Sequence, residues 1–146
     1  MKKDPTGWTK LIVICCIIIA IYYITGANNY KTPEREYPVS HASYEHVNQD
    51  VGCGSKYSDD KKEDIFNSRY KNHWMVWSGE IVLASSDDVS LNIDGKGTQD
   101  LRVEFKNKNA GYNLIKGSNI TVKFLMKNCG GCFLPFGGEQ GTIDNN

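Results

Sequence analysis

Residues 89–106, VSLNIDGKGTQDLRVEFK, decide the fold of this chain, because apolar and polar side chains alternate on both sides of a glycine-rich centre. Side chains on a β-strand point alternately to opposite faces, so this pattern buries one face and leaves the other in water. The alternation predicts strands at 89–94 and 100–106, and the glycines within 95–97 predict a hairpin between them.

Three further segments around this hairpin have the character of strands. Strands are predicted at 74–84, where Gly79 permits a bend or bulge, and at 118–127, where the alternation repeats. A last strand is predicted over 131–143. Pro135 cannot donate a hydrogen bond to a ladder, so this strand should lie at an edge or break at the proline. The predicted fold class is mainly β, with five strands in a small closed or nearly closed barrel.

A short amphipathic helix is predicted immediately before the first strand, over residues 58–70. Ser58 and the acidic residues that follow it supply capping groups and negative charge at the positive end of the helix dipole. Ile65, Phe66 and Tyr70 fall on one face by their spacing. We expect this helix to plug one end of the barrel.

The first part of the chain has the pattern of a transmembrane anchor or a signal sequence. Residues 11–24, LIVICCIIIAIYYI, contain no charge, and the twenty residues from 8 to 27 match the length that crosses a bilayer. Three lysines precede the apolar run, which predicts a single span with a cytoplasmic N-terminus and an extracytoplasmic domain, periplasmic in a bacterium. Cleavage as a secretory signal sequence is the alternative. The predicted organisation is an anchor or signal at 1–27, a polar linker at 28–57, and a barrel domain with its leading helix at 58–146.

The charge balance bears on the class of partner. The chain has 17 basic and 17 acidic residues, and residues 1–27 carry a net charge of +2, so the remainder carries −2. A domain that binds nucleic acid through its phosphates would show a basic surplus. His41, His46 and Cys53 match no zinc spacing, and no catalytic set of side chains stands out, so we expect no metal, cofactor or enzymatic site.

The five cysteines divide into Cys15 and Cys16, inside the apolar run, and three more in the exported part. Cys129 and Cys132 form a C-G-G-C motif that falls in a turn after a strand, not at the helix start where a redox-active thiol has its pKa lowered. A structural disulfide is therefore predicted, either from Cys53 to Cys129 or Cys132, or within the turn. A bridge from Cys53 would contribute about 3–4 kcal/mol on the chain-entropy model.

Two segments carry a resemblance to a known family. DIFNSRYKNHWMVWSGEIV, at 64–82, and LIKGSNITVKFLMK, at 114–127, are similar to small exported OB-fold proteins grouped with the tRNA anticodon-binding-like domains. The resemblance implies a five-stranded Greek-key barrel with a leading helix. A member that binds nucleic acid would be expected to show basic and aromatic residues on its second and third strands, and these strands show no exposed aromatic residue here.

The first functional hypothesis is a non-enzymatic, membrane-anchored module that binds a protein or envelope partner outside the cytoplasm. Candidate contacts are Trp74, Trp77, Arg102 and Lys96 of the glycine-rich hairpin. The two tryptophans have opposite parity on their strand, so one should be core and the other exposed. One alternative is an OB domain that binds single-stranded oligonucleotides. The absence of a basic surplus makes binding to nucleic acid unfavourable. Another is a thiol-disulfide enzyme that acts through Cys129 and Cys132.

Overall fold

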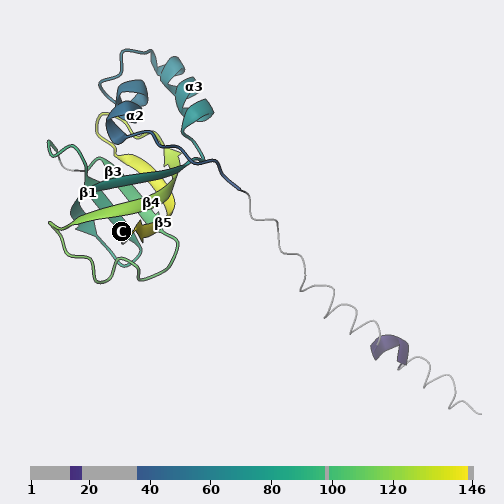
Figure 1. Ribbon diagram of the computed structural model, residues 1–146. Helices are drawn as coiled ribbons and strands as arrows, with labels where there is room; N and C mark the ends of the chain where they lie inside the picture. The colour runs from purple at the N-terminus through teal and green to yellow at the C-terminus, as the bar shows by residue number, and fades with distance from the viewer. Residues whose placement is uncertain (1–13, 18–35, 98, 145–146) are drawn as a thin grey trace, which may run out of the picture. The chain divides into compact units, whose positions relative to one another are not determined.

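The structure of the protein is a computed structural model that describes residues 14–17, 36–97 and 99–144 (Figure 1). The chain divides into two compact units, Met1–Glu36 and Tyr37–Asn146. In the first unit, the described residues 14–17 are α-helical. Within the described part of the chain, no helix is long and apolar enough to cross a bilayer. The predicted anchor at 1–27 otherwise lies outside the described residues.

The second unit contains a closed barrel of five strands. These strands are β1 (Trp74–Ala84), β2 (Asp88–Asn92), β3 (Leu101–Phe105), β4 (Asn119–Asn128) and β5 (Phe136–Asp144). Their order around the barrel is β1-β2-β3-β5-β4, and pairing of β1 with β4 closes it. All neighbouring strands are antiparallel except β3 and β5, which are parallel. The prediction of a mainly β fold with a small five-stranded barrel is confirmed.

The last strand is shorter than predicted and lies inside the sheet. β5 begins at Phe136, directly after Pro135, and pairs with β3 on one side and β4 on the other. The proline stands before the ladder, where its missing N–H costs no strand hydrogen bond. The strand therefore breaks at Pro135, and an edge position for it is wrong, because the closed barrel gives β5 two neighbours.

Gly79 serves a close approach between two strands. A Cβ atom at this position would lie 2.7 Å from the carbonyl oxygen of Asn92, on the neighbouring strand. The irregularity in the pairing of β1 with β2 falls later, between Ile81 and Leu83. The glycine thus lets the backbone of β2 come close, and the bulge that bends β1 follows it along the strand.

Trp77 is the centre of the barrel core. The indole is only 4% exposed and meets the rings of Tyr44, Phe124 and Phe136 edge to face, with centroid distances of 5.3 to 5.7 Å. Its Nε1 donates a hydrogen bond of 2.9 Å to the carbonyl oxygen of Ala42. A large ring with its polar atom satisfied is stable in a dry interior, so this side chain fixes the packing around it.

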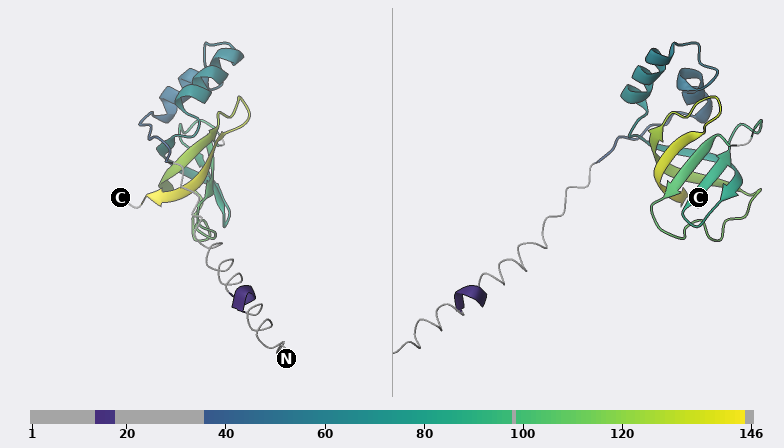
Figure 2. Two further views of the ribbon diagram at one scale, coloured as in Figure 1. Left: turned by 90° about the vertical axis from the view of Figure 1, so that its right-hand side faces the viewer. Right: turned by 180° about the vertical axis from the view of Figure 1, so that it is seen from behind.

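Two helices lie at one end of the barrel (Figure 1, Figure 2). The predicted helix is present as α3 (Asp59–Arg69), which buries Ile65 and Phe66. A second helix, α2 (Tyr44–Val51), buries three residues in the same core. It falls in the stretch that the sequence pattern indicated as a polar linker. A helix of eight residues has too few turns to show a clear period, and tertiary contacts of Tyr44 hold it in place.

Two buried tyrosine hydroxyl groups donate hydrogen bonds to carboxylates. Tyr44 donates to Oδ1 of Asp100 over 2.9 Å, and Tyr70 donates to Oδ2 of Asp50 over 2.6 Å. Burial, and then the hydrogen bond to Asp50, raises the pKa of Tyr70 to about 12. Burial raises the pKa of Tyr44 as well, with the hydrogen bond to Asp100 as the next cause. Both hydroxyl groups therefore stay protonated in the folded protein at a pH at which an unfolded tyrosine would ionise.

The raised pKa of Tyr70 predicts a loss of stability in alkaline solution. Its stabilising contribution is complete below the unfolded pKa of 10.0 and is lost as the pH rises toward the folded pKa of about 12. We expect Tyr70→Phe to flatten the fall in the free energy of unfolding above pH 10, measured by urea denaturation at a series of pH values. Tyr57→Phe, at an exposed position, is the control and should keep the wild-type slope. Identical slopes for the two variants would contradict the prediction.

Candidate functional site

A groove of about 850 Å³ runs between α3 and the barrel. One wall is α3, the opposite wall is formed by residues of β3, β4 and β5, and the loop 129–135 between β4 and β5 completes the rim. Val51, Phe66 and Phe136 contribute apolar surface to the lining. The groove therefore joins helix, sheet and loop residues that are far apart in the sequence.

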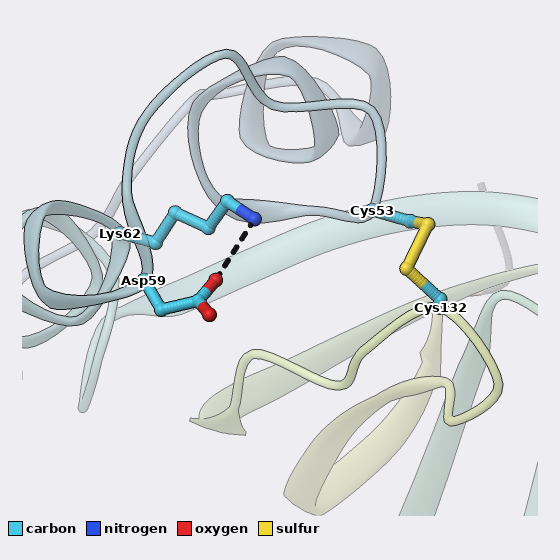
Figure 3. Close-up of a disulfide and its surroundings, with 4 residues drawn as sticks. All are labelled: Cys53, Asp59, Lys62 and Cys132. Carbon is cyan, nitrogen blue, oxygen red and sulfur yellow. Dashed lines mark hydrogen bonds and ion pairs between the residues drawn. A yellow bond between two sulfur atoms is a disulfide. The ribbon is translucent and has the colours of Figure 1, made fainter.

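A disulfide joins Cys53 and Cys132 (Figure 3), and both residues line this groove. Cys53 follows α2, whereas Cys132 lies in the loop 129–135, and the two are 79 residues apart. Both residues are exposed. Of the predicted pairings, the bridge from Cys53 to Cys132 is the one that forms. Cys129 keeps a free, half-buried thiol in the same lining.

The loop 129–135 presents two apolar side chains to solvent. Gly130 has a φ of +62°, and a Cβ atom there would lie 2.6 Å from the carbonyl oxygen of Leu134, so glycine is required. The backbone N–H of Gly131 donates to that same carbonyl oxygen over 2.9 Å, which closes a tight turn. Phe133, on this turn, is 98% exposed, and Leu134 is 70% exposed.

Charges around the groove are balanced. Four basic residues and four acidic residues line the groove: Lys62, Lys71, Arg102 and Lys127, and Asp59, Glu63, Glu104 and Glu139. Lys62 Nζ lies 3.3 Å from Asp59 Oδ1 beside the disulfide (Figure 3), and Lys127 Nζ lies 3.6 Å from Glu139 Oε2. These pairs are partly exposed, so they add little to stability, but they cancel the local charge.

The structure brings together only some of the residues predicted for the site. Arg102, Cys53, Cys129 and Cys132 line the groove. Trp74, Trp77 and Lys96 do not. Trp77 is a core residue, so it is not a surface contact. The opposite parity of the two tryptophans had predicted that one of them would be in the core.

Trp74 and Lys96 face solvent elsewhere on the barrel. Trp74 is half-buried on the outer face of β1, with Lys123 Nζ 5.2 Å from its ring centroid. Lys96 is exposed in the hairpin between β2 and β3, where its backbone N–H donates to Asp94 Oδ1 over 2.8 Å. Neither residue contributes to the groove.

The sequence analysis missed Phe133 and Leu134 as surface residues. It included them in the last strand, whose alternation would have buried one of the two. Pro135 was the available signal, because a strand that breaks at this proline leaves both preceding residues in the loop. The residues of α3 that line the groove were not predicted either, because the spacing of apolar residues in that helix indicates only its buried face.

Two aspartates of the barrel accept hydrogen bonds from backbone N–H groups in turns. Asp100 Oδ2 accepts hydrogen bonds from the backbone N–H groups of Ile93 and Asp94, over 2.6 and 3.1 Å. Asp87 Oδ1 accepts one from the backbone N–H of Asn109 over 3.0 Å. Such aspartates cap turns. Across the described ranges, no group of three or more His, Cys, Asp or Glu residues is placed to hold a metal ion.

Comparison of the chain with protein-family models, with curated proteins and with solved structures finds no match. Chemically, the groove offers a surface for binding, with an apolar lining that includes Leu134 and with balanced charge. Phe133 is exposed on the loop beside it.

Proposed function

We propose that this protein is a non-enzymatic, membrane-anchored binding module whose exported, OB-like barrel recognises a protein or envelope partner. The strand order β1-β2-β3-β5-β4, with β3 parallel to β5, supports an OB-like Greek-key barrel. In that architecture the loop between the fourth and fifth strands borders the usual binding face. The groove has this position, because it is lined by β3 residues and by the loop 129–135. One fold of this kind can bind many different ligands, so the residues around the groove determine which partner it takes.

The observation that carries the proposal is the exposure of Phe133, at 98%, on a loop held by a disulfide and a tight turn. When a partner covers an exposed aromatic side chain, the free energy falls by about 25 cal/mol per Å² of apolar area removed from water. Because the loop is already fixed, little conformational entropy is lost on binding. Leu134, which lines the groove, and Phe133, next to it on the loop, are therefore suited to act as anchors for a partner.

The lining of the groove favours a peptide segment of a protein partner over an oligonucleotide. Four basic and four acidic residues are found among the lining residues, so the groove offers no net positive charge to phosphates. Its two aromatic residues, Phe66 and Phe136, are each only 5% exposed and provide no platform for stacking bases. A segment with apolar side chains and few charges suits these surroundings.

The thiol-disulfide alternative has less support from the same region. Cys132 is bonded to Cys53, and Cys129 follows the end of β4 in a loop, so the free thiol does not lie at a helix N-terminus. An enzyme of this kind would reduce insulin with dithiothreitol and lose that activity on Cys129→Ser. We expect the full chain to show no such activity.

Site-specific photocrosslinking tests the proposed binding face. We expect benzoylphenylalanine at position 133 of the full chain, in membranes of the native cell, to give a protein adduct of discrete mass. The same group at position 96, in the exposed hairpin, is the control and should give none. Adducts at 96 but not at 133 would move the binding face to the hairpin and contradict the proposal. Tight, salt-sensitive binding of the purified full chain to a single-stranded oligonucleotide would favour the alternative.

Charge introduced into the loop provides a second measurement. Leu134→Asp should lower the yield of the adduct at position 133 about tenfold or more, the effect of losing one energetically dominant contact. Because Leu134 is 70% exposed, the substitution should leave the urea midpoint nearly unchanged. Leu83→Asp, at an exposed apolar site on β1 outside the groove, is the matched control and should leave the adduct intact.

A further inference from the structure

The segment between β3 and β4, residues 106–118, carries a second exposed apolar surface. It lies at the end of the barrel opposite to α2 and α3 (Figure 1, Figure 2). Tyr112 is 76% exposed and Ile115 is 73% exposed. An exposed pair of large apolar side chains close together in one segment marks a site of interaction, whereas single exposed residues do not.

Backbone hydrogen bonds fix this segment on the barrel. The N–H of Gly111 donates to the carbonyl oxygen of Ser86 over 2.9 Å, and the N–H of Gly117 donates to that of Ile81 over 2.8 Å. Between these two points, Leu114 is half-buried against the core. Exposure of Tyr112 and Ile115 is therefore a property of the folded structure: the segment turns Leu114 inward and leaves its neighbours in water.

The same part of the chain is basic. Residues 106–118 contain three lysines and no aspartate or glutamate. Lys108 and Lys116 are exposed and flank the apolar pair in the sequence. Two carboxylates near the segment are engaged: Asp87 accepts from the backbone N–H of Asn109, and Asp88 lies 3.1 Å from Arg102 Nη2. A third, Glu80, is exposed on β1 opposite Asn119, and the lysines of the segment outnumber it. This end of the barrel thus combines two exposed apolar side chains with two exposed lysines.

We propose that residues 106–118 form a lipid-contacting surface that rests on an anionic bilayer. Tyr112 and Ile115 enter the interfacial layer, while Lys108 and Lys116 extend to lipid phosphates. Tyrosine is favoured at the depth of the headgroups, and lysine keeps its charge in the polar layer while its aliphatic chain lies along apolar surface. Anionic headgroups complement the lysines, and the inserted side chains supply the apolar contribution.

The size and form of this surface favour a bilayer over a protein. Two side chains on a turn bury far less than the roughly 1,000 Å² that a specific protein interface needs. A bilayer accepts such a small insertion, because its surface is fluid and moulds to the inserted groups. An acidic protein or a second copy of this chain would need further apolar contacts around the pair. The surface is separate from the groove, so the two proposals can fail independently.

Hydrogen–deuterium exchange of the full chain tests the surface. The chain is mixed with nanodiscs of phosphatidylcholine alone or with nanodiscs that also contain phosphatidylglycerol. We expect peptides covering 106–118 to exchange severalfold more slowly only with phosphatidylglycerol, and this protection should decline as salt is added. Exchange in the barrel strands reports folding in the same samples.

Two pairs of substitutions sharpen the experiment. Lys108→Gln with Lys116→Gln should remove most of the protection, whereas Lys56→Gln with Lys61→Gln, at exposed positions beside α3, should keep it. Tyr112→Ser with Ile115→Ser should remove it with normal exchange in the strands. Equal protection in both kinds of nanodisc, or none in either, would overturn the proposal. Protection that depends on protein concentration without nanodiscs would assign the surface to a second copy instead.

Discussion

Replacing Trp77 with alanine is expected to lower the free energy of unfolding by about 3–5 kcal/mol, measured by urea denaturation of the full chain. The indole is 4% exposed and meets three aromatic rings, so its removal leaves a cavity that the closed sheet cannot fill by collapse. The substitution also leaves the carbonyl oxygen of Ala42 without its donor. Because Tyr44 packs on this ring, exchange of the α2 amides should rise as well.

Trp74→Ala is the matched control, since it removes the same side chain from the same strand. Trp74 faces outward and keeps only partial contacts, among them the ammonium group of Lys123. Its loss should cost about 1 kcal/mol, within the ordinary range for a partly exposed residue. Similar losses for the two variants would show that the core does not depend on Trp77. A large effect of Trp74→Ala on the adduct at position 133, with stability unchanged, would return Trp74 to the binding face.

The strands were predictable because alternation is a local property of the sequence. Alternation located β2, β3 and β4, since one buried face makes every second side chain apolar. The run interrupted by Gly79 matched the span of β1, whereas β5 begins at Phe136 and not at Gly131. The parallel pairing of β3 with β5 is not local: it depends on how the barrel closes. Helix α2 escaped prediction because its eight residues are held by Tyr44 packing on Trp77, a contact between positions far apart in the chain.

The site was less predictable than the fold. The groove is formed by α3, three strands and one loop, which are far apart in the sequence. No local sequence pattern predicts that these elements pack next to one another. The cysteines were the exception, because their chemistry restricts them to few pairings, and one of these was found. Arg102 was named as an outward residue of β3 and does line the groove. Phe133 was placed in a strand, because its apolar character suits a core as well as it suits a loop that binds.

Removing the disulfide is expected to lower the free energy of unfolding by about 4 kcal/mol, on the chain-entropy relation for a long loop. The bridge spans 79 residues, so it restricts the unfolded chain strongly. Cys53 and Cys132 are both exposed, so substitution by serine removes little packing. We therefore expect Cys53→Ser with Cys132→Ser to reduce the urea midpoint under oxidising conditions, and dithiothreitol to reduce that of the wild type equally.

Cys129→Ser is the control for this prediction, because it removes a thiol from the same groove and leaves the bridge intact. It should change stability by less than about 1 kcal/mol. Dithiothreitol should have no effect on the double variant, which has no bridge to reduce. Cys132→Ser alone separates a further possibility: if it is more stable than the double variant, Cys53 has paired with Cys129. A wild type whose midpoint is unmoved by dithiothreitol would contradict the stabilising role, and the loop that presents Phe133 would then owe its shape to the turn at Gly130.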